Sequence, residues 1–142
     1  MQSNTLLELE LNAELRRVAE ACRAWERLAQ QIGLGEEAAG AVELALCEAI
    51  NNAIIHACGN CPSRVVRVTV HQRADWLVLQ VHDQGWPMTT EPASVDVRSG
   101  ADCAEGGRGI GIIRGLMWHV RYRSGPAGNT LEMQYPLPGD QR

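Results

Sequence analysis

The stretch Glu48-Ala-Ile-Asn-Asn52 is followed along the chain by Asp83-Gln-Gly-Trp-Pro87 and then by Gly107-Arg-Gly-Ile-Gly111. The first stretch lies within a helical pattern of apolar residues, the second ends a run of β-forming residues, and the third places several glycines where a helix can begin. Each has a common structural explanation when it occurs alone: a solvated surface pair, a turn and a hinge. Their order and the patterns around them therefore matter more than any single stretch.

Strand and helix patterns alternate around these stretches. Residues 5–11 alternate apolar and charged side chains, which indicates a half-buried strand, and Asn12 is expected to cap the helix that follows it. The expected helices are residues 12–32, 36–57 and 109–118, and the expected strands are 5–11, 64–72, 76–83, 120–124 and 129–137. This order predicts an α+β fold, a two-layer sandwich in which helices cover one face of a mixed, mostly antiparallel sheet.

Composition narrows the function classes. The chain has 142 residues, which suits one domain, and its net charge of −4 leaves no basic stripe for nucleic acid. No leader-like segment or apolar run of membrane-spanning length is recognised, so we expect a cytoplasmic protein with no membrane partner. All 13 basic residues are arginines. Without lysine, phosphate groups can be bound only by backbone amides, a helix dipole, a divalent metal and arginine.

The five cysteines are an odd number, which favours free, reduced thiols. Cys58-Gly-Asn-Cys61, with His56 nearby, raises the possibility of a metal or redox site. A zinc site needs four ligands, and the sequence offers no second close pair. A helix end followed by a Gly-Asn turn is the favoured interpretation, and the roles of these cysteines and of Cys103 stay open.

The second expected helix carries the first candidate for chemistry. Glu48 and Asn52 are four residues apart, so both project from one helix face, with His56 one turn further on. A carboxylate beside a carboxamide can polarise a hydroxyl group and supply an oxygen ligand to Mg²⁺. This face lies opposite a strongly apolar stripe, which keeps it available to solvent or ligand.

The other two stretches suit the base and the phosphates of a nucleotide. Asp83 stands at a strand end, where its carboxylate can accept a hydrogen bond from an exocyclic amine such as that of adenine. The run Gly106-Gly-Arg-Gly-Ile-Gly111 can bring backbone amides to an anion at a helix N-terminus, with Arg108 as a phosphate donor. Residues 84–106 between them have no sustained period, which is typical of a functional lid.

Together these residues resemble a known superfamily. Glu48-x-x-x-Asn52, Asp83-x-Gly-x-Pro87, Gly-Gly-Arg-Gly-Ile-Gly-Ile and the late Gly-Asn-Thr130-Leu look like the N, G1 and G2 boxes of the GHKL ATPases. In its compact size and in the motif Asn-Ala-Ile-Ile-His, the chain is most similar to the anti-sigma factor serine kinases of the RsbW and SpoIIAB type. The resemblance covers about residues 5 to 137. It implies the histidine-kinase-like ATPase fold as a single domain, 1–142, with an ATP lid at about 88–106.

The resemblance also implies a role for each matching position. Glu48 would act as the general base toward a serine hydroxyl, and Asn52 would coordinate Mg²⁺. Asp83 would hold the adenine amino group, with Gly85 letting the ring approach and Thr130 adding a hydroxyl beneath it. The other implied nucleotide-binding residues are Pro87, Gly107, Arg108, Gly109, Ile110 and Gly111.

The function implied is that of an ATP- and Mg²⁺-dependent serine-protein kinase in a partner-switching system. Such a protein holds a sigma factor or an equivalent target, phosphorylates a serine of a STAS-domain antagonist, and forms a homodimer. Two other functions remain open from the sequence. One is an ATP-binding module that sequesters its partner without kinase activity, and the other is a histidine-kinase-like ATPase core.

Overall fold

The computed structural model describes residues 3–86 and 106–138 and contains a five-stranded sheet with three helices. The strands are β1 (Ser3–Asn12), β2 (Val65–Arg73), β3 (Trp76–Asp83), β4 (Trp118–Gly125) and β5 (Gly128–Pro136). The helices are α1 (Val18–Gln31), α2 (Glu36–Asn52) and α3 (Gly106–Leu116). A short 3₁₀ turn, η1 (Leu15–Arg17), precedes α1, and a π-helical segment, η2 (Ala53–Ala57), continues α2.

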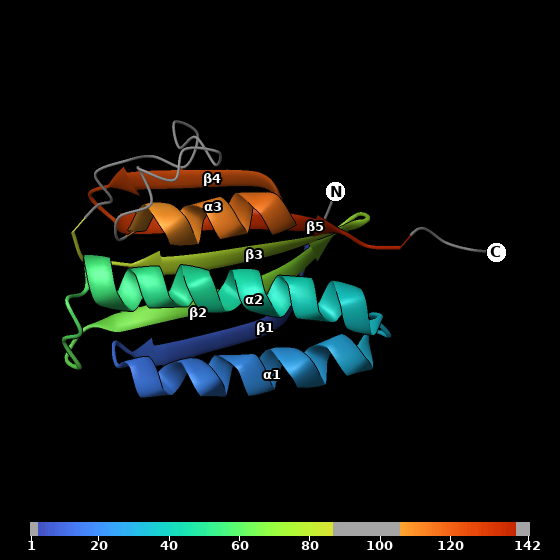
Figure 1. Cartoon of the computed structure of the whole chain (residues 1–142), viewed down its shortest axis with the longest axis horizontal. Coiled ribbons are helices and arrows are strands. Elements are labelled where there is room, and N and C mark those ends of the chain that lie inside the picture. The colour runs from blue at the N-terminus through green and yellow to red at the C-terminus, as the bar shows by residue number, and fades with distance from the viewer. Residues whose placement is uncertain (1–2, 87–105, 139–142) are drawn as a thin grey trace.

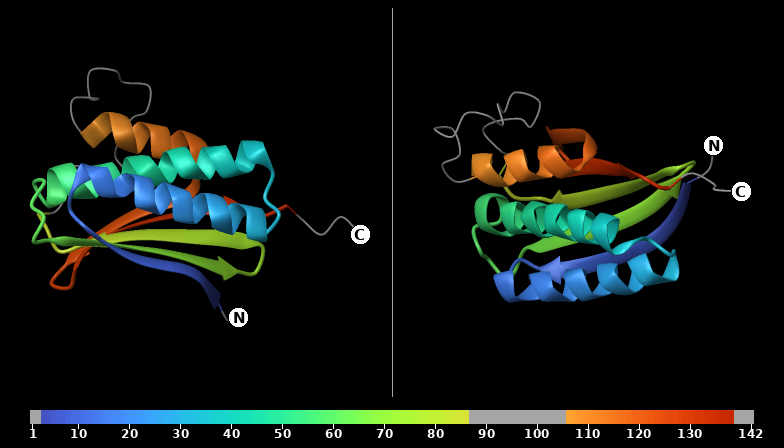
Figure 2. Two further views of the ribbon diagram at one scale, coloured as in Figure 1. Left: turned by 90° about the horizontal axis from the view of Figure 1, so that it is seen from below. Right: turned by 45° about the vertical axis from the view of Figure 1, so that its right-hand side comes forward.

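The strands follow the spatial order β1-β2-β3-β5-β4, and every neighbouring pair is antiparallel. All three helices lie on the same face of the sheet (Figures 1 and 2). The predicted α+β sandwich is therefore confirmed, with a sheet that is antiparallel throughout. Strand alternation explains the layering, because Val66, Val68 and Val70 of β2 are buried toward the helices while the residues between them face the other side.

The core forms between this sheet face and α1 and α2. Trp25 of α1 is fully buried, and its indole N–H donates to the Ala39 carbonyl at 3.0 Å, so its one polar atom is satisfied. Leu46 and Ile50 of α2 are also fully buried in the same cluster. They are four residues apart, as expected for an apolar stripe on one helix face.

The stretch Glu36–Ala57 has 22 residues and contains an 18-residue window with a mean hydropathy of 1.3, so by length and composition alone it could span a membrane. The sequence analysis recognised no such run, and this stretch qualifies by length and composition only. Its apolar character has a structural explanation, because Val42, Leu46 and Ile50 are fully buried in the core. The expectation of no membrane partner stays a prediction.

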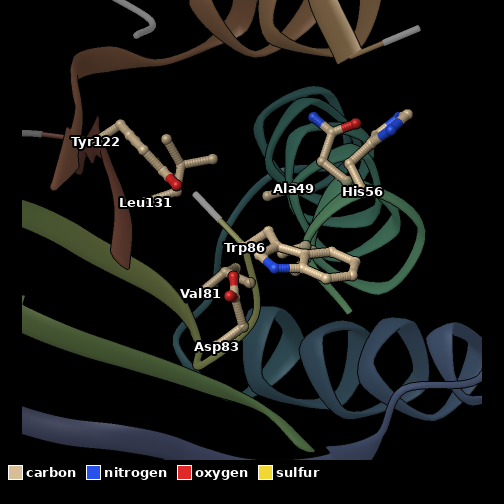
Figure 3. Close-up of a pocket in the computed structure, with 10 residues that line it drawn as sticks. Ala49, His56, Val81, Asp83, Trp86, Tyr122 and Leu131 are labelled. Carbon is tan, nitrogen blue, oxygen red and sulfur yellow. The ribbon is translucent and has the colours of Figure 1, made fainter. Parts of the chain in front are cut away.

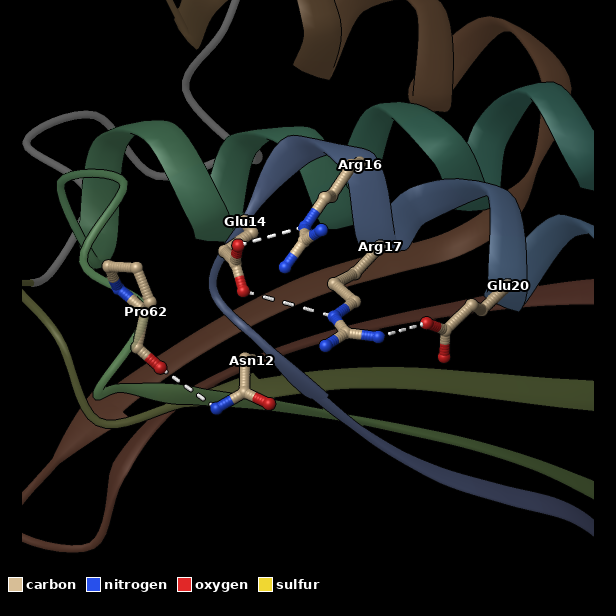
Figure 4. Close-up of polar contacts among 6 residues, drawn as sticks. All are labelled: Asn12, Glu14, Arg16, Arg17, Glu20 and Pro62. Atoms are coloured by element: carbon tan, nitrogen blue, oxygen red, sulfur yellow. Dashed lines mark hydrogen bonds and ion pairs between the residues drawn. The ribbon is translucent and has the colours of Figure 1, made fainter.

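The junction between β1 and α1 differs from the expectation at Asn12. Asn12 does not cap the helix: it is the last residue of β1, paired with Val65, and its side-chain amide donates to the Pro62 carbonyl at 2.8 Å (Figure 4). The helical turns begin after Glu14, whose carboxylate contacts both neighbouring arginines. Pairing with β2 extends the strand by one residue, and this tertiary contact outweighs the local capping preference of asparagine.

The three stretches that opened the sequence analysis meet at one end of the molecule. The C-terminal end of α2 with η2, the end of β3 and the beginning of α3 lie at the same edge of the two layers (Figure 1). They come from segments far apart in sequence, and the order of the strands brings them together. This end of the fold contains the candidate site.

Candidate functional site

A pocket opens between the helix layer and the sheet at this end (Figure 3). The helical wall combines small side chains with two polar ones, and the sheet side adds apolar residues and a carboxylate. The lining residues are Ala49, Asn52, Ala53, His56, Ala57, Val81, Asp83, Trp86, Tyr122 and Leu131. The cavity volume is about 40 Å³. Most of the wall is apolar, with a few polar groups converging on it, which is typical of a site for a flat organic ring.

Asp83 supplies the charge of the pocket. Its side chain is only 6% exposed at the end of β3. Oδ1 accepts two hydrogen bonds, from the Gly85 amide at 2.8 Å and from the Asn129 side-chain amide at 2.7 Å. Among the described residues no donor reaches Oδ2. Burial raises the pKa of the Asp83 carboxyl above its ordinary value. The two hydrogen bonds lower the pKa, but by less than burial raises it.

Asn129 is a residue of this site that the sequence analysis missed. It is 2% exposed on β5, directly paired with Asp83. Besides Asp83, its amide nitrogen lies 3.0 Å from the Gly85 carbonyl oxygen and 3.3 Å from that of Trp86. Its carbonyl oxygen accepts a bond from the Ser124 hydroxyl at 2.7 Å. Asn129 therefore holds the carboxylate and the turn after β3 in one arrangement.

Thr130 does not lie where the resemblance implied. It pairs with His82, and its hydroxyl is 2.8 Å from Nδ1 of that ring, on the sheet face opposite the pocket. Successive side chains of a strand point to opposite faces. Because Leu131 and Asn129 face the pocket side, Thr130 between them cannot. The expected hydroxyl beneath a bound ring is thus corrected, and Asn129 is the β5 residue next to Asp83.

Gly85 has a packing role that differs from the one implied. A Cβ atom at this position would lie 1.9 Å from the Ala57 carbonyl oxygen and 2.4 Å from its carbon. The same carbonyl accepts the Trp86 amide at 2.9 Å. Glycine is required because the turn after β3 runs directly against the Ala57 carbonyl, at the end of η2.

Asn52 lies in the pocket wall, and Glu48 precedes it by four residues on α2, as predicted. The amide nitrogen of Asn52 is buried without a hydrogen-bond partner. An unpaired buried amide is costly, and a ligand that engages this side chain would remove the cost. Glu48 is half-buried and is not among the lining residues of the pocket.

The glycine run forms the first turns of α3, which begins at Gly106 and not at Gly109. Gly107, Arg108 and Gly109 are therefore helical, although nothing is described of the Arg108 side chain. Ile110 is 1% exposed and packs in the core, so its side chain serves the fold. Gly111 follows it in the helix. The lid residues 88–105, together with Pro87 and Cys103, lie outside the described residues.

Four of the five cysteines lie in the described ranges. Cys22, Cys47, Cys58 and Cys61 are free, and no cluster of three or more His, Cys, Asp or Glu side chains suited to a metal occurs in the described ranges. The segment after Cys58 is the expected turn, with Gly59 at φ 61° and Asn60 at φ 56°. Burial raises the pKa of the Cys47 thiol to about 12, and this keeps it protonated at neutral pH.

Comparisons with known proteins agree with this geometry. Residues 11–135 match the histidine kinase-like ATPase domain family. Among solved structures, the fold is similar to the RsbU and RsbW domains of Rv1364c from Mycobacterium tuberculosis, with a TM-score of 0.69 and 16% sequence identity. That match covers 100% of this chain and 34% of the other, so this chain spans about a third of that protein's length. No curated protein matches the chain significantly in sequence. The family match extends over most of the chain and includes every motif described above: the chain belongs to the histidine kinase-like ATPase domain family.

Proposed function

We propose that the chain is an ATP-dependent serine-protein kinase of a partner-switching system. The observation that carries this proposal is the buried Asp83 carboxylate, whose Oδ1 is used by the fold while Oδ2 has no donor among the described residues. A carboxylate oxygen left free in an apolar pocket selects a ligand with an N–H donor, and the exocyclic amine of adenine is such a donor. Family membership supports ATP as that ligand.

The residues around Asp83 suit the rest of the nucleotide. The small side chains Ala49, Ala53 and Ala57 form one smooth helical wall, and Val81 and Leu131 form the sheet side. Beyond the base, the N-terminal turns of α3 offer backbone amides with no partner within their own helix, and the helix dipole favours the negative charge of phosphates. The glycines of this run permit close approach.

Mg²⁺ fits the polar end of the same wall. Asn52 lies in this wall with a buried amide nitrogen that has no partner, and its carboxamide oxygen is the kind of ligand that Mg²⁺ takes. When bound, the ion would neutralise phosphate charge during transfer. Glu48 stands one turn before Asn52 on the same face of α2, where it would accept the proton from an incoming serine hydroxyl.

The protein substrate we propose is a STAS-domain antagonist, and the protein held in the alternative state is a sigma factor or an equivalent target. A homodimer in the cytoplasm is part of the same proposal. These assignments rest on the resemblance of the sequence motifs, with the fold of the RsbW-containing structure in support. Co-purification of the full chain with its bound proteins would identify the partners.

Label transfer tests the kinase assignment. The chain is incubated with γ-labelled ATP, Mg²⁺ and a candidate antagonist, and Glu48→Gln is compared with Glu37→Gln, an exposed glutamate in the first turn of the same helix. We expect acid-stable label on the antagonist, loss of about 100-fold or more in rate for Glu48→Gln and little change for Glu37→Gln. Acid-labile label would favour the histidine-kinase-like alternative. ATP binding with no transfer by the wild-type chain would favour the sequestering module.

A further inference from the structure

Trp86 both lines the pocket and is largely exposed. Its side chain is 69% exposed, the highest value among the large exposed apolar residues. Exposed tryptophan is costly to leave in water and is enriched at binding sites. In Figure 3 the indole lies beside the cavity, between Asp83 and the helical wall that carries His56. The ring is therefore placed where a bound base would meet it.

The backbone of Trp86 is held by hydrogen bonds, while its ring is largely exposed. The Trp86 amide donates to the Ala57 carbonyl at 2.9 Å, and the Trp86 carbonyl oxygen is 3.3 Å from the Asn129 amide nitrogen. Gly85, immediately before it, packs against the same helix end. These contacts set the position of the Trp86 Cα atom. Two side-chain torsions then decide where the indole lies, so its motion has little entropy to lose on binding.

Arg64 occupies one side of this ring. Its guanidinium carbon lies 5.7 Å from the centroid of the indole, within the range of a cation–π contact. The Arg64 backbone is itself held, since its amide donates to the Cys61 carbonyl at 3.0 Å and its carbonyl accepts from Ala13 at 2.9 Å. A cation over one face of the indole leaves the other face for a second flat group.

The cavity is smaller than a nucleotide base requires, and its walls differ in how tightly they are packed. Its volume is about 40 Å³, whereas pockets for small organic ligands measure roughly 300–1,000 Å³. The alanine wall of α2 and η2 and the Val81 and Leu131 side chains are packed into the core or the sheet. Trp86 is the lining side chain with the most solvent around it. Movement of the indole is therefore the least costly way to enlarge the cavity for a base.

From this arrangement we propose that Trp86 stacks on the base of the bound nucleotide, that Arg64 braces its opposite face, and that the pair makes the site prefer purines to pyrimidines. The inference rests on the proposed nucleotide site and adds its specificity-determining side chain. Asp83 reads the amine at the edge of the base, while Trp86 covers the flat surface. A purine offers the indole a larger surface than a pyrimidine does, so stacking discriminates between the two.

Calorimetric titration of ATP and of UTP, each with Mg²⁺, into the full chain tests the proposal. Trp86→Ala should bind ATP about 5- to 150-fold more weakly, and its preference for ATP over UTP should fall. Trp86→Phe retains a stacking ring and should stay within about threefold of the wild type. Arg64→Gln should weaken ATP binding about two- to fivefold. Trp118→Ala is the matched control, because Trp118 is an exposed tryptophan that packs on Tyr135 and does not line the pocket.

Fluorescence gives a second readout that a structural role would not change. ATP should quench the emission of the wild-type chain and of Trp118→Phe, but not that of Trp86→Phe at saturating ATP. Equal ATP affinity in Trp86→Ala and the wild type, or an unchanged ATP preference, would overturn the proposal while leaving the nucleotide site intact. If the wild-type chain binds neither nucleotide, the proposed function itself fails. If Trp86 served only to bind a protein partner, Trp86→Ala and the wild type would bind ATP equally well.

Discussion

Replacement of Asn129 by alanine tests the hydrogen-bond network that positions Asp83. Asn129 is buried, and its amide nitrogen donates to the Asp83 carboxylate at 2.7 Å and lies close to two backbone carbonyls of the following turn. A hydrogen bond to a charged group contributes about 1.5–3 kcal/mol and a neutral one about 1 kcal/mol. With the Ser124 bond also lost, we expect Asn129→Ala to lower the free energy of unfolding by about 3–5 kcal/mol.

The loss should depend on pH in a defined direction. Because the folded-state pKa of Asp83 is raised above its ordinary value of 3.8, protonated Asp83 stabilises the fold at low pH. That contribution is lost as pH rises through the folded-state pKa. The Asn129 bond lowers this pKa, so its removal raises the pKa further and makes ionised Asp83 more costly at neutral pH. The difference between Asn129→Ala and the wild type should therefore be smaller near pH 4 than near pH 7.

Urea unfolding, followed by the emission of the tryptophans, which include the buried Trp25, measures both effects. Thr130→Val is the matched control, since it changes the next residue on the same strand but removes only the contact with His82 on the opposite face. We expect the control to lose no more than about 1 kcal/mol and to bind ATP normally. A loss of less than about 1 kcal/mol for Asn129→Ala, or equal losses for both variants, would refute the assigned network.

Two further substitutions separate packing from binding. Gly85→Ala should destabilise the fold by about 3 kcal/mol or more, because the added Cβ would overlap the Ala57 carbonyl; a change below about 1 kcal/mol by urea unfolding would contradict that packing. Asn52→Ala should abolish Mg²⁺-dependent ATP binding measured by calorimetry. It should leave stability unchanged or slightly higher, because it removes a buried amide nitrogen that has no partner. If Asn52→Ala bound ATP with Mg²⁺ as tightly as the wild type, Asn52 would not be a metal ligand.

Much of the fold could be predicted because its patterns are local. The alternation in β1 and the hairpin of β2 and β3 are visible in the sequence. The antiparallel pairing of β2 with β3 confirms the hairpin, and Ala74 in the turn between them has φ 54°. The start of α3 was placed too late because glycine disfavours a helix interior. Burial of Ile110 and Ile113 in the core outweighs that preference.

The position of Thr130 could have been predicted correctly. Leu131 and Met133 are the buried, helix-facing residues of β5, and Asn129 has the same parity along the strand. The motif resemblance named the residue one place further on, which strand alternation puts on the other face. The packing of Gly85 against η2 could not be predicted in this way, because it joins two segments that share no local sequence pattern. No sequence signal short of the tertiary structure reveals it.

In the proposed function the free oxygen of Asp83 accepts a hydrogen bond from the amine of an adenine base. Asp83→Asn tests it directly, since an asparagine can keep its oxygen at the Oδ1 position, where it still accepts from Gly85 and Asn129. Its amide nitrogen then replaces Oδ2 and presents a donor to the ligand. By calorimetry we predict at least about tenfold weaker ATP binding, with stability at neutral pH unchanged or higher because a buried charge is gone. Equal ATP affinity in the wild type and Asp83→Asn would contradict the role of Asp83 in binding adenine.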